Sequence, residues 1–163
     1  MARSSHLIWQ NTMHETCAFY FARGIELGVL VPDEAKDWAR RLVDEGRPGC
    51  DEIVDSVLAF STTDLIATLR EASNGADANQ VSGWLIHAIM NRYRAGEFSS
   101  HDAACLAHSV SASCGQIEAA DNFDGICDAF SIADLGQYGT VAECVSELES
   151  ALSLYGRRKP DEN

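Results

Sequence analysis

The chain has 163 residues, of which 46% are hydrophobic, and its 25 acidic residues against 12 lysines and arginines leave a net charge of −13. This length suits one globular domain, and the composition excludes a disordered chain. No apolar run approaches the roughly 20 residues that span a bilayer, and an anionic surface repels nucleic acid and anionic lipid. Residues 1–17 also lack the continuous apolar core of a secretory signal. We therefore expect a cytoplasmic protein that binds neither nucleic acid nor membrane.

Helical spacing of apolar residues predicts four helices in the first half of the chain. The first covers residues 4–24 and the second residues 32–46, with a proline at its start and a glycine at its end. A third covers residues 50–60. A fourth begins at once, because Ser61 and Asp64 have the spacing of a capping box.

The most apolar stretch of the chain, residues 79–95, predicts a central helix around which the others pack. At 100° per residue its apolar side chains cover roughly 240° of the helix surface. These side chains belong to Val81, Trp84, Leu85, Ile86, Ala88, Ile89, Met90 and Tyr93. The narrow strip left over is polar and consists of Gly83, His87, Asn91 and Arg94. This polar strip either recognises an anion in a cleft or, alternatively, faces solvent and neighbouring helices.

Capping signals divide the last third of the chain into further helices. They are the pairs Ser99–Asp102, Ser131–Asp134 and Thr140–Glu143. The final helix keeps its apolar stripe as far as Gly156, and the alternating pattern of a strand does not occur. The sequence thus predicts an all-α protein of seven or eight short helices. We expect a single domain over residues 1–159 and a frayed tail at residues 160–163.

One short motif, FSxxDL, occurs twice, beginning at Phe60 and again at Phe130. In each copy the phenylalanine would end one helix and the serine would cap the next. Two related helical halves, or a helical-repeat scaffold, would produce this recurrence. Shared capping chemistry alone is the alternative.

Six cysteines are spread widely along the chain, and no two of them form a CxxC pair. A chain of this length does not need disulfides to hold its core together. We therefore expect the cysteines to be thiols, buried as small hydrophobic side chains.

Three aspartates, Asp121, Asp124 and Asp128, fall within about 60° of one another on a predicted helix over residues 116–130. Like charges at these spacings destabilise a helix, so a cation or a basic partner would relieve their repulsion. The carboxylates would bind Lys or Arg side chains of another protein, or a hard cation, although the calcium-binding pattern of the EF-hand is absent. The alternative is a solvated acidic face.

A second candidate site consists of His101, Cys105 and His108, which lie at positions i, i+4 and i+7 of a predicted helix. Imidazole and thiolate are zinc ligands, and ligands one turn apart on a helix can share a metal ion. The fourth ligand would be Cys127, His87 or, in a catalytic site, water. The alternative is a tightly packed interior helix with hydrogen-bonded histidines, because residues 103–115 carry no charge and are rich in Ala, Ser and Cys.

No motif of a known reaction is present in the sequence. The nucleophile elbow, the zinc-protease helix, the phosphate-binding loop and the dinucleotide fingerprint are all absent. His14 and Cys17 are three residues apart, but adjacent turns of one helix align a thiol and an imidazole poorly for nucleophilic catalysis. The sequence therefore favours a non-enzymatic protein.

The leading hypothesis is a small acidic module that binds a basic protein partner through Asp121, Asp124 and Asp128. Immunity proteins, antitoxins and other inhibitors of basic enzymes share this size, charge and helicity, which is an analogy of physical character alone. The alternatives are a zinc protein or metalloenzyme that uses the His101–Cys105–His108 set, and a helical-repeat scaffold. The sequence carries no pattern that fixes an oligomeric state.

Overall fold

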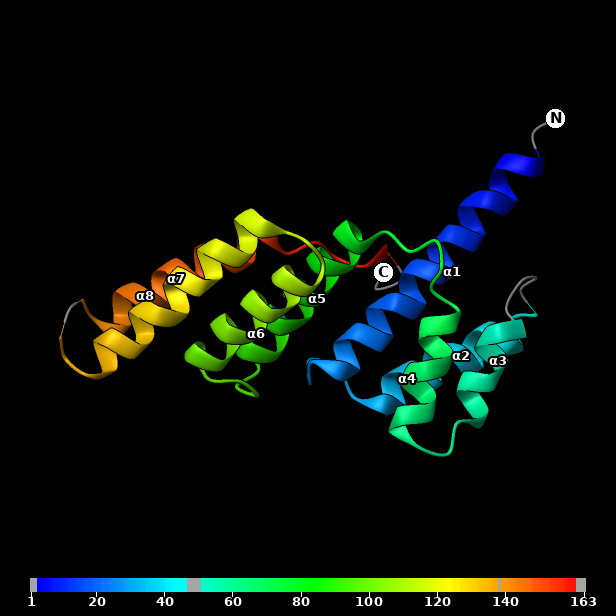
Figure 1. The fold of residues 1–163 in the computed structure, drawn as a ribbon, viewed down its shortest axis with the longest axis horizontal. Helices are drawn as coiled ribbons and strands as arrows, with labels where there is room; N and C mark the ends of the chain where they lie inside the picture. The colour runs from blue at the N-terminus through cyan, green and yellow to red at the C-terminus, as the bar shows by residue number, and fades with distance from the viewer. Residues whose placement is uncertain (1–2, 47–50, 138, 161–163) are drawn as a thin grey trace. The chain divides into compact units, whose positions relative to one another are not determined.

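A computed structural model describes residues 3–46, 51–137 and 139–160, and these residues form eight α-helices and no β-strand. The all-α class is confirmed (Figure 1). The helices are α1 (Arg3–Glu26), α2 (Pro32–Asp44), α3 (Asp51–Leu58), α4 (Thr62–Glu71), α5 (Ala78–Arg94), α6 (Ser100–Ser113), α7 (Ile117–Asp134) and α8 (Val141–Tyr155). By its internal contacts the chain divides into two compact units, Met1–Val81 and Ser82–Asn163, with the boundary inside α5.

Three helices begin at the side-chain caps that the sequence predicts. The hydroxyl oxygens of Ser61, Ser99 and Thr140 accept the backbone N–H three residues further on, at 3.1, 3.1 and 3.3 Å. At the start of α8 the carboxylate of Glu143 also accepts the N–H of Thr140 at 2.9 Å, which completes a capping box. Local side-chain chemistry thus sets the start of α4, α6 and α8.

The predicted cap at Ser131 and Asp134 is wrong. Helix α7 continues through both residues, and the Ser131 hydroxyl donates to the carbonyl oxygen of Cys127 at 3.3 Å. Phe130 is buried within α7, whereas Phe60, which opens the other FSxxDL copy, is fully exposed ahead of α4. The two copies have different structures, so the motif does not support a helical repeat.

In the unit Met1–Val81, helix α1 packs against α2 and α4, and α3 packs against α2 and α4. The rings of Phe21 and Trp38 meet at the α1–α2 contact with their centroids 5.1 Å apart. Leu65 and Leu69 of α4 are completely buried. These apolar contacts form the core of the unit.

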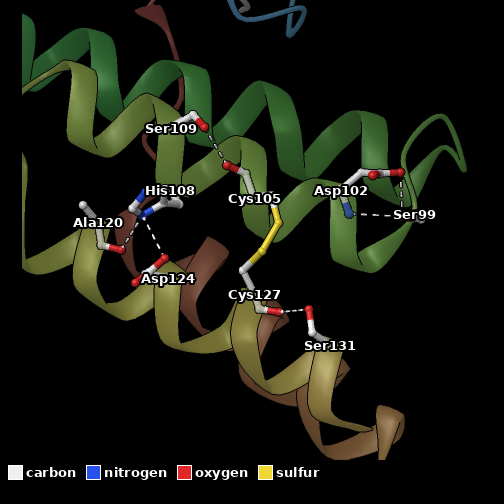
Figure 2. The surroundings of a disulfide bond; sticks show 9 residues. All are labelled: Ser99, Asp102, Cys105, His108, Ser109, Ala120, Asp124, Cys127 and Ser131. Atoms are coloured by element: carbon white, nitrogen blue, oxygen red, sulfur yellow. Dashed lines mark hydrogen bonds and ion pairs between the residues drawn. A yellow bond between two sulfur atoms is a disulfide. The ribbon is translucent and has the colours of Figure 1, made fainter. Parts of the chain in front are cut away.

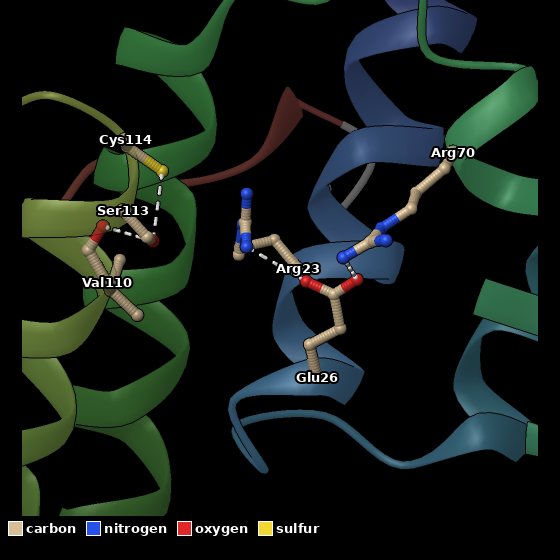
Figure 3. A network of polar contacts seen from close by, with 6 residues as sticks. All are labelled: Arg23, Glu26, Arg70, Val110, Ser113 and Cys114. Carbon is tan, nitrogen blue, oxygen red and sulfur yellow. Dashed lines mark hydrogen bonds and ion pairs between the residues drawn. The ribbon is translucent and has the colours of Figure 1, made fainter. Parts of the chain in front are cut away.

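A polar network joins α1 to α4 beside this core (Figure 3). Glu26 forms an ion pair with Arg23 of its own helix, at 2.9 Å, and a second with Arg70 of α4. The Arg23 guanidinium carbon also lies 5.5 Å from the centre of the Phe19 ring. The ion pair of Arg70 with Glu26 therefore helps to hold α4 against α1.

In the unit Ser82–Asn163, helix α7 packs against both α6 and α8, and α6 also contacts α8 (Figure 1). The turn between α6 and α7 contains Gly115, whose φ of 72° lies in the left-handed region that glycine tolerates best. Phe123 of α7 is completely buried, and its ring centroid lies 5.7 Å from that of Tyr155 of α8. The packing leaves one side of α7 exposed between its two neighbours.

Six of the eight side chains in the apolar arc predicted for the central helix are buried in α5, and the other two, Ala88 and Tyr93, are half-buried. The six buried side chains are Val81, Trp84, Leu85, Ile86, Ile89 and Met90. Asn91 and Arg94 of the polar strip are exposed, as expected for its outer end. Neither α5 nor any other described helix is both long enough and apolar enough to cross a bilayer.

Candidate functional site

The three predicted aspartates all lie on the exposed side of α7, because Phe123 and Ile126 hold the opposite side in the core. The structure nevertheless separates them. Asp121 and Asp128 face α8, where each lines a hollow between the two helices. Asp124 faces α6, with its Oδ1 atom 3.9 Å from Nδ1 of His108.

Two hollows follow each other along the line where α7 and α8 meet. The first has a volume of about 540 Å³ and is lined by Asp121 and Ile126 of α7 and by Leu154 of α8, among others. The second, of about 460 Å³, extends towards Asp128 and Ile132. Because residues Gly125 and Glu147 line both hollows, we treat them as one feature, the α7–α8 groove.

In the described part of the chain, the α7–α8 groove is open above Gly125. A Cβ atom built on this glycine would have no heavy atom within 4 Å of it, other than its own chain neighbours and helix backbone. Apolar side chains are also exposed along the groove, since Ile132 is 40% and Leu154 is 61% accessible. The groove therefore offers both open volume and unburied apolar surface.

The charge of the groove is negative throughout. Asp121 and Asp128 stand on its α7 side, and Glu143 and Glu147 stand on its α8 side. The sequence from residue 95 to residue 156 contains no lysine or arginine at all. Of the basic side chains that flank this segment, Arg94 pairs with Glu149 at 2.7 Å and Arg157 donates to the carbonyl oxygen of Leu154 at 2.8 Å.

Sequence reasoning missed Glu143 and Glu147, which belong to a different helix from the predicted aspartates. The signal that would have found them is the absence of basic residues over positions 95–156. Because this segment has acidic residues and no basic ones, negative charge is expected on several of its helices and not on α7 alone. Which helix shares a groove with α7 is not encoded in the spacing of the aspartates.

The predicted zinc set is only partly assembled. Cys105 of α6 is joined by a disulfide to Cys127 of α7, with Cα atoms 5.6 Å apart. The ligand atoms of His101, Cys105 and Cys127 all lie within 4.8 Å of one another, and all three residues are half-buried. Cys127, expected only as a fourth ligand, is therefore a central member of the cluster.

His108 does not join this cluster, which corrects the predicted set. Its Nδ1 atom lies 3.0 Å from the carbonyl oxygen of Ala120, a hydrogen bond in which the imidazole N–H donates (Figure 2). Cys105 and His108 are three residues apart, so their side chains diverge along the α6–α7 contact. Cys105 meets Cys127, and His108 meets α7 one to two turns nearer the Gly115 turn.

The expectation that all the cysteines are buried thiols is also corrected. Cys17, Cys114 and Cys144 are buried thiols, and the Sγ atom of Cys114 lies 4.0 Å from the Ser113 hydroxyl (Figure 3). Cys105 and Cys127 instead form a disulfide. Cys50 lies outside the described residues. The packing of α6 on α7 makes the pair, although 22 residues separate them in sequence.

The polar strip of α5 packs against the end of α8. The carbonyl oxygen of Gly83 accepts the Arg157 N–H at 2.8 Å, and Arg94 forms its ion pair with Glu149. A Cβ atom on Gly156 would lie 3.5 Å from the backbone of His87. The strip therefore mediates contact between helices and does not line the α7–α8 groove.

Two features of the described residues have the chemistry to bind a ligand. One is the α7–α8 groove, and the other is the His101–Cys105–Cys127 cluster. Neither resembles a reaction centre with a paired nucleophile and base. His14 and Cys17, the one such pair that the sequence suggests, are both buried in α1. Comparisons with protein-family models, with characterised proteins and with solved structures found no match to this chain.

Proposed function

We propose that this protein is a non-enzymatic interaction module and that its α7–α8 groove binds a basic amphipathic helix of a partner protein. The observation that carries the proposal is the combination of four carboxylates with an open, partly apolar groove in a segment that has no lysine or arginine. A helix that lays its apolar face into a groove between two helices is a common mode of recognition. Here its flanking Lys or Arg side chains would meet carboxylates on both sides.

Three of the four groove carboxylates are available for such contacts, while that of Glu143 also accepts the N–H of Thr140 in the capping box of α8. Within the described part of the chain, Asp121, Asp128 and Glu147 take part in no ion pair. Glu143 and Glu147 are one turn apart on α8, and like charges at this spacing destabilise a helix by roughly 0.2–0.5 kcal/mol per pair. A basic partner removes this repulsion on binding, so the free energy of its attraction adds to that of apolar burial.

The apolar part of the groove gives the interaction its shape. Ile126, Ala151 and Leu154 line the first hollow, and Ile132 lines the second. Burial of apolar surface contributes about 25 cal/mol per Å² removed from water, and it does not depend on salt as charge contacts do. Partner side chains seated over Gly125 would thus supply affinity, and the carboxylates would supply orientation and a fast association rate.

A module of this kind fits the physical role of an inhibitor, immunity protein or antitoxin that covers a basic surface of its target. A uniformly acidic face also disfavours binding to nucleic acid, because phosphates and carboxylates repel each other. Size, charge and groove chemistry support this class.

Affinity capture from a lysate of the source cells tests the proposal with three baits. The first is the wild-type chain, and the second is a groove variant carrying Asp121→Asn, Asp128→Asn and Glu147→Gln. The third removes the same number of charges from α7 outside the groove, through Glu118→Gln, Asp124→Asn and Asp134→Asn. Each capture is run at low and at high salt.

We expect a basic protein that is retained by the wild-type chain and by the charge-matched variant at low salt. The groove variant and high salt should both lose it. Equal retention by all three baits would show that the groove has no special role. If no protein is retained in a salt-sensitive way by the wild-type chain, the proposal is wrong.

A further inference from the structure

We propose that Cys105, Cys127 and His101 form a redox-dependent zinc site. In the oxidised chain the two cysteines are joined as a disulfide, and in the reduced chain their thiolates and the His101 imidazole bind one Zn²⁺. This inference is independent of the proposed partner binding, because it uses the α6–α7 contact and none of the carboxylates of the groove.

The hairpin of α6 and α7 brings the three residues together. His101 and Cys105 are one turn apart on α6, and Cys127 stands opposite Cys105 on the antiparallel helix α7. One turn beyond Cys127, the Phe130 ring lies against the His101 ring, with centroids 6.1 Å apart. Because Phe130 is buried, it anchors the histidine on the side of the disulfide.

The separation of the ligand atoms suits a tetrahedral zinc ion after a small adjustment. With Zn–S bonds of about 2.3 Å and a Zn–N bond of about 2.0 Å, the ligand atoms of such a site lie roughly 3.5–3.8 Å apart. In the oxidised chain all three ligand atoms lie within 4.8 Å of one another. Breaking the S–S bond lets the sulfurs move apart to the required distance, while the imidazole moves towards them.

The surroundings favour a cation that solvent can reach. His101, Cys105 and Cys127 are half-buried, so a metal ion or a small reductant has access to them. Residues 95–156 contain no lysine or arginine that would repel Zn²⁺. Three protein ligands leave the fourth position to water, the coordination of catalytic zinc sites.

The exchange between the two states balances as an ordinary thiol–disulfide reaction. A dithiol reductant transfers two electrons and two protons to the Cys105–Cys127 disulfide and becomes a disulfide itself. The two protein thiols then release two protons as they bind Zn²⁺. An oxidising disulfide reverses the sequence, takes up the two electrons and frees the metal ion. Zinc and the S–S bond therefore exclude each other.

The test measures Zn²⁺ binding to the full-length chain in both states, by competition with a chromophoric chelator. The chain is oxidised, or reduced with a dithiol that is then removed without air. We expect one Zn²⁺ per reduced chain and binding weaker by about tenfold or more in the oxidised chain. Co²⁺ in place of Zn²⁺ should give thiolate charge-transfer absorption in the reduced chain only.

Variants identify the ligands. Cys127→Ser and His101→Ala should each weaken Zn²⁺ binding by about tenfold or more in the reduced chain. His108→Ala and Cys144→Ser are the matched controls, one a histidine of the same helix and the other a buried thiol, and both should bind as the wild-type chain does. Loss of binding in His108→Ala without loss in His101→Ala would overturn the ligand set.

Circular dichroism of each sample shows whether the helices persist. If reduction lowers helicity, recovery on addition of Zn²⁺ supports the site, and failure to recover contradicts it. A reduced chain that keeps its helices but binds no Zn²⁺ also overturns the proposal, as does Zn²⁺ binding that Cys127→Ser leaves unchanged.

Discussion

Two glycines inside helices, Gly83 of α5 and Gly125 of α7, differ in what surrounds their Cα atoms. A Cβ atom on Gly83 would lie 2.8 Å from Cγ and 2.9 Å from Cβ of Arg157, too close for either side chain. A Cβ atom on Gly125 would meet nothing within 4 Å. Gly83 is thus required by packing at the end of α8, whereas the position of Gly125 has room for a side chain.

Gly125→Ala should stabilise the protein by about 0.5–1 kcal/mol, because alanine loses less backbone entropy in a helix interior than glycine does. Gly83→Ala, the matched substitution, should destabilise it, because Arg157 and the segment that carries it must shift. Thermal unfolding of the two variants measures both effects. A rise in unfolding temperature for Gly83→Ala would contradict the close contact with Arg157.

At the scale of single helices, a hydroxyl side chain either caps the start of a helix or lies within the helix and bonds to its backbone. Thr140 caps α8 through a reciprocal pair of hydrogen bonds with Glu143, whereas Ser131 lies inside α7 and donates to Cys127. The sequence signals of the two residues are nearly the same. In the second case Phe130, the residue before Ser131, is buried inside α7, whereas the cap of α8 follows exposed residues.

Thr140→Ala should destabilise the protein by about 1 kcal/mol, the usual effect of removing an N-cap side chain. Ser131→Ala should change the free energy of unfolding by less than half of that, because its hydroxyl caps no helix. Urea unfolding followed by helical ellipticity compares the two. If both variants lost the same free energy of unfolding, the Thr140 hydroxyl would not stabilise the protein as an N-cap.

The Cys105–Cys127 disulfide joins two helices across a closed loop of 22 residues. In the chain-entropy model, closing such a loop lowers the entropy of the unfolded chain and so raises its free energy by about 3 kcal/mol. Reduction should therefore lower the unfolding midpoint in urea in the absence of metal. The double variant Cys105→Ala, Cys127→Ala is the control, because a reductant should not affect its midpoint; a shift in this variant would assign the effect to another disulfide.

At the scale of the whole molecule, the net charge of −13 is unevenly distributed, because the segment 95–156 has no basic side chain. Asp121→Lys with Asp128→Lys places positive charge on the groove. We expect slower association with the basic partner by about tenfold or more at low salt, and a smaller difference at high salt. Stopped-flow or surface-binding kinetics give the rate. An unchanged association rate would exclude these residues from the interaction.

Local signals were sufficient for much of the fold. The all-α class, the starts of α4, α6 and α8, and the buried arc of α5 follow from periodicity and capping, which involve residues at most four positions apart. The exposure of Asp121, Asp124 and Asp128 follows in the same way, since Phe123 and Ile126 fix the inner side of α7.

The candidate site required contacts between distant residues. On α6, helical spacing places His101, Cys105 and His108 on one side but does not say what each will meet. The packing of α7 against α6 places Cys127 in a disulfide with Cys105, and it places the carbonyl oxygen of Ala120 in a hydrogen bond with His108. A shared face of one helix is therefore a necessary condition for a metal site, and the opposing helix selects the ligands.

The sequence by itself determined that this protein is helical, acidic and apolar along one side of each helix, because these properties depend on composition and on spacing within a turn. Tertiary structure alone decided which helices meet. It divided the aspartates of α7 between two neighbours, closed the disulfide, and added Glu143 and Glu147 to the groove. The physical reason is that helix periodicity places a side chain on a face, whereas only packing determines what that face touches.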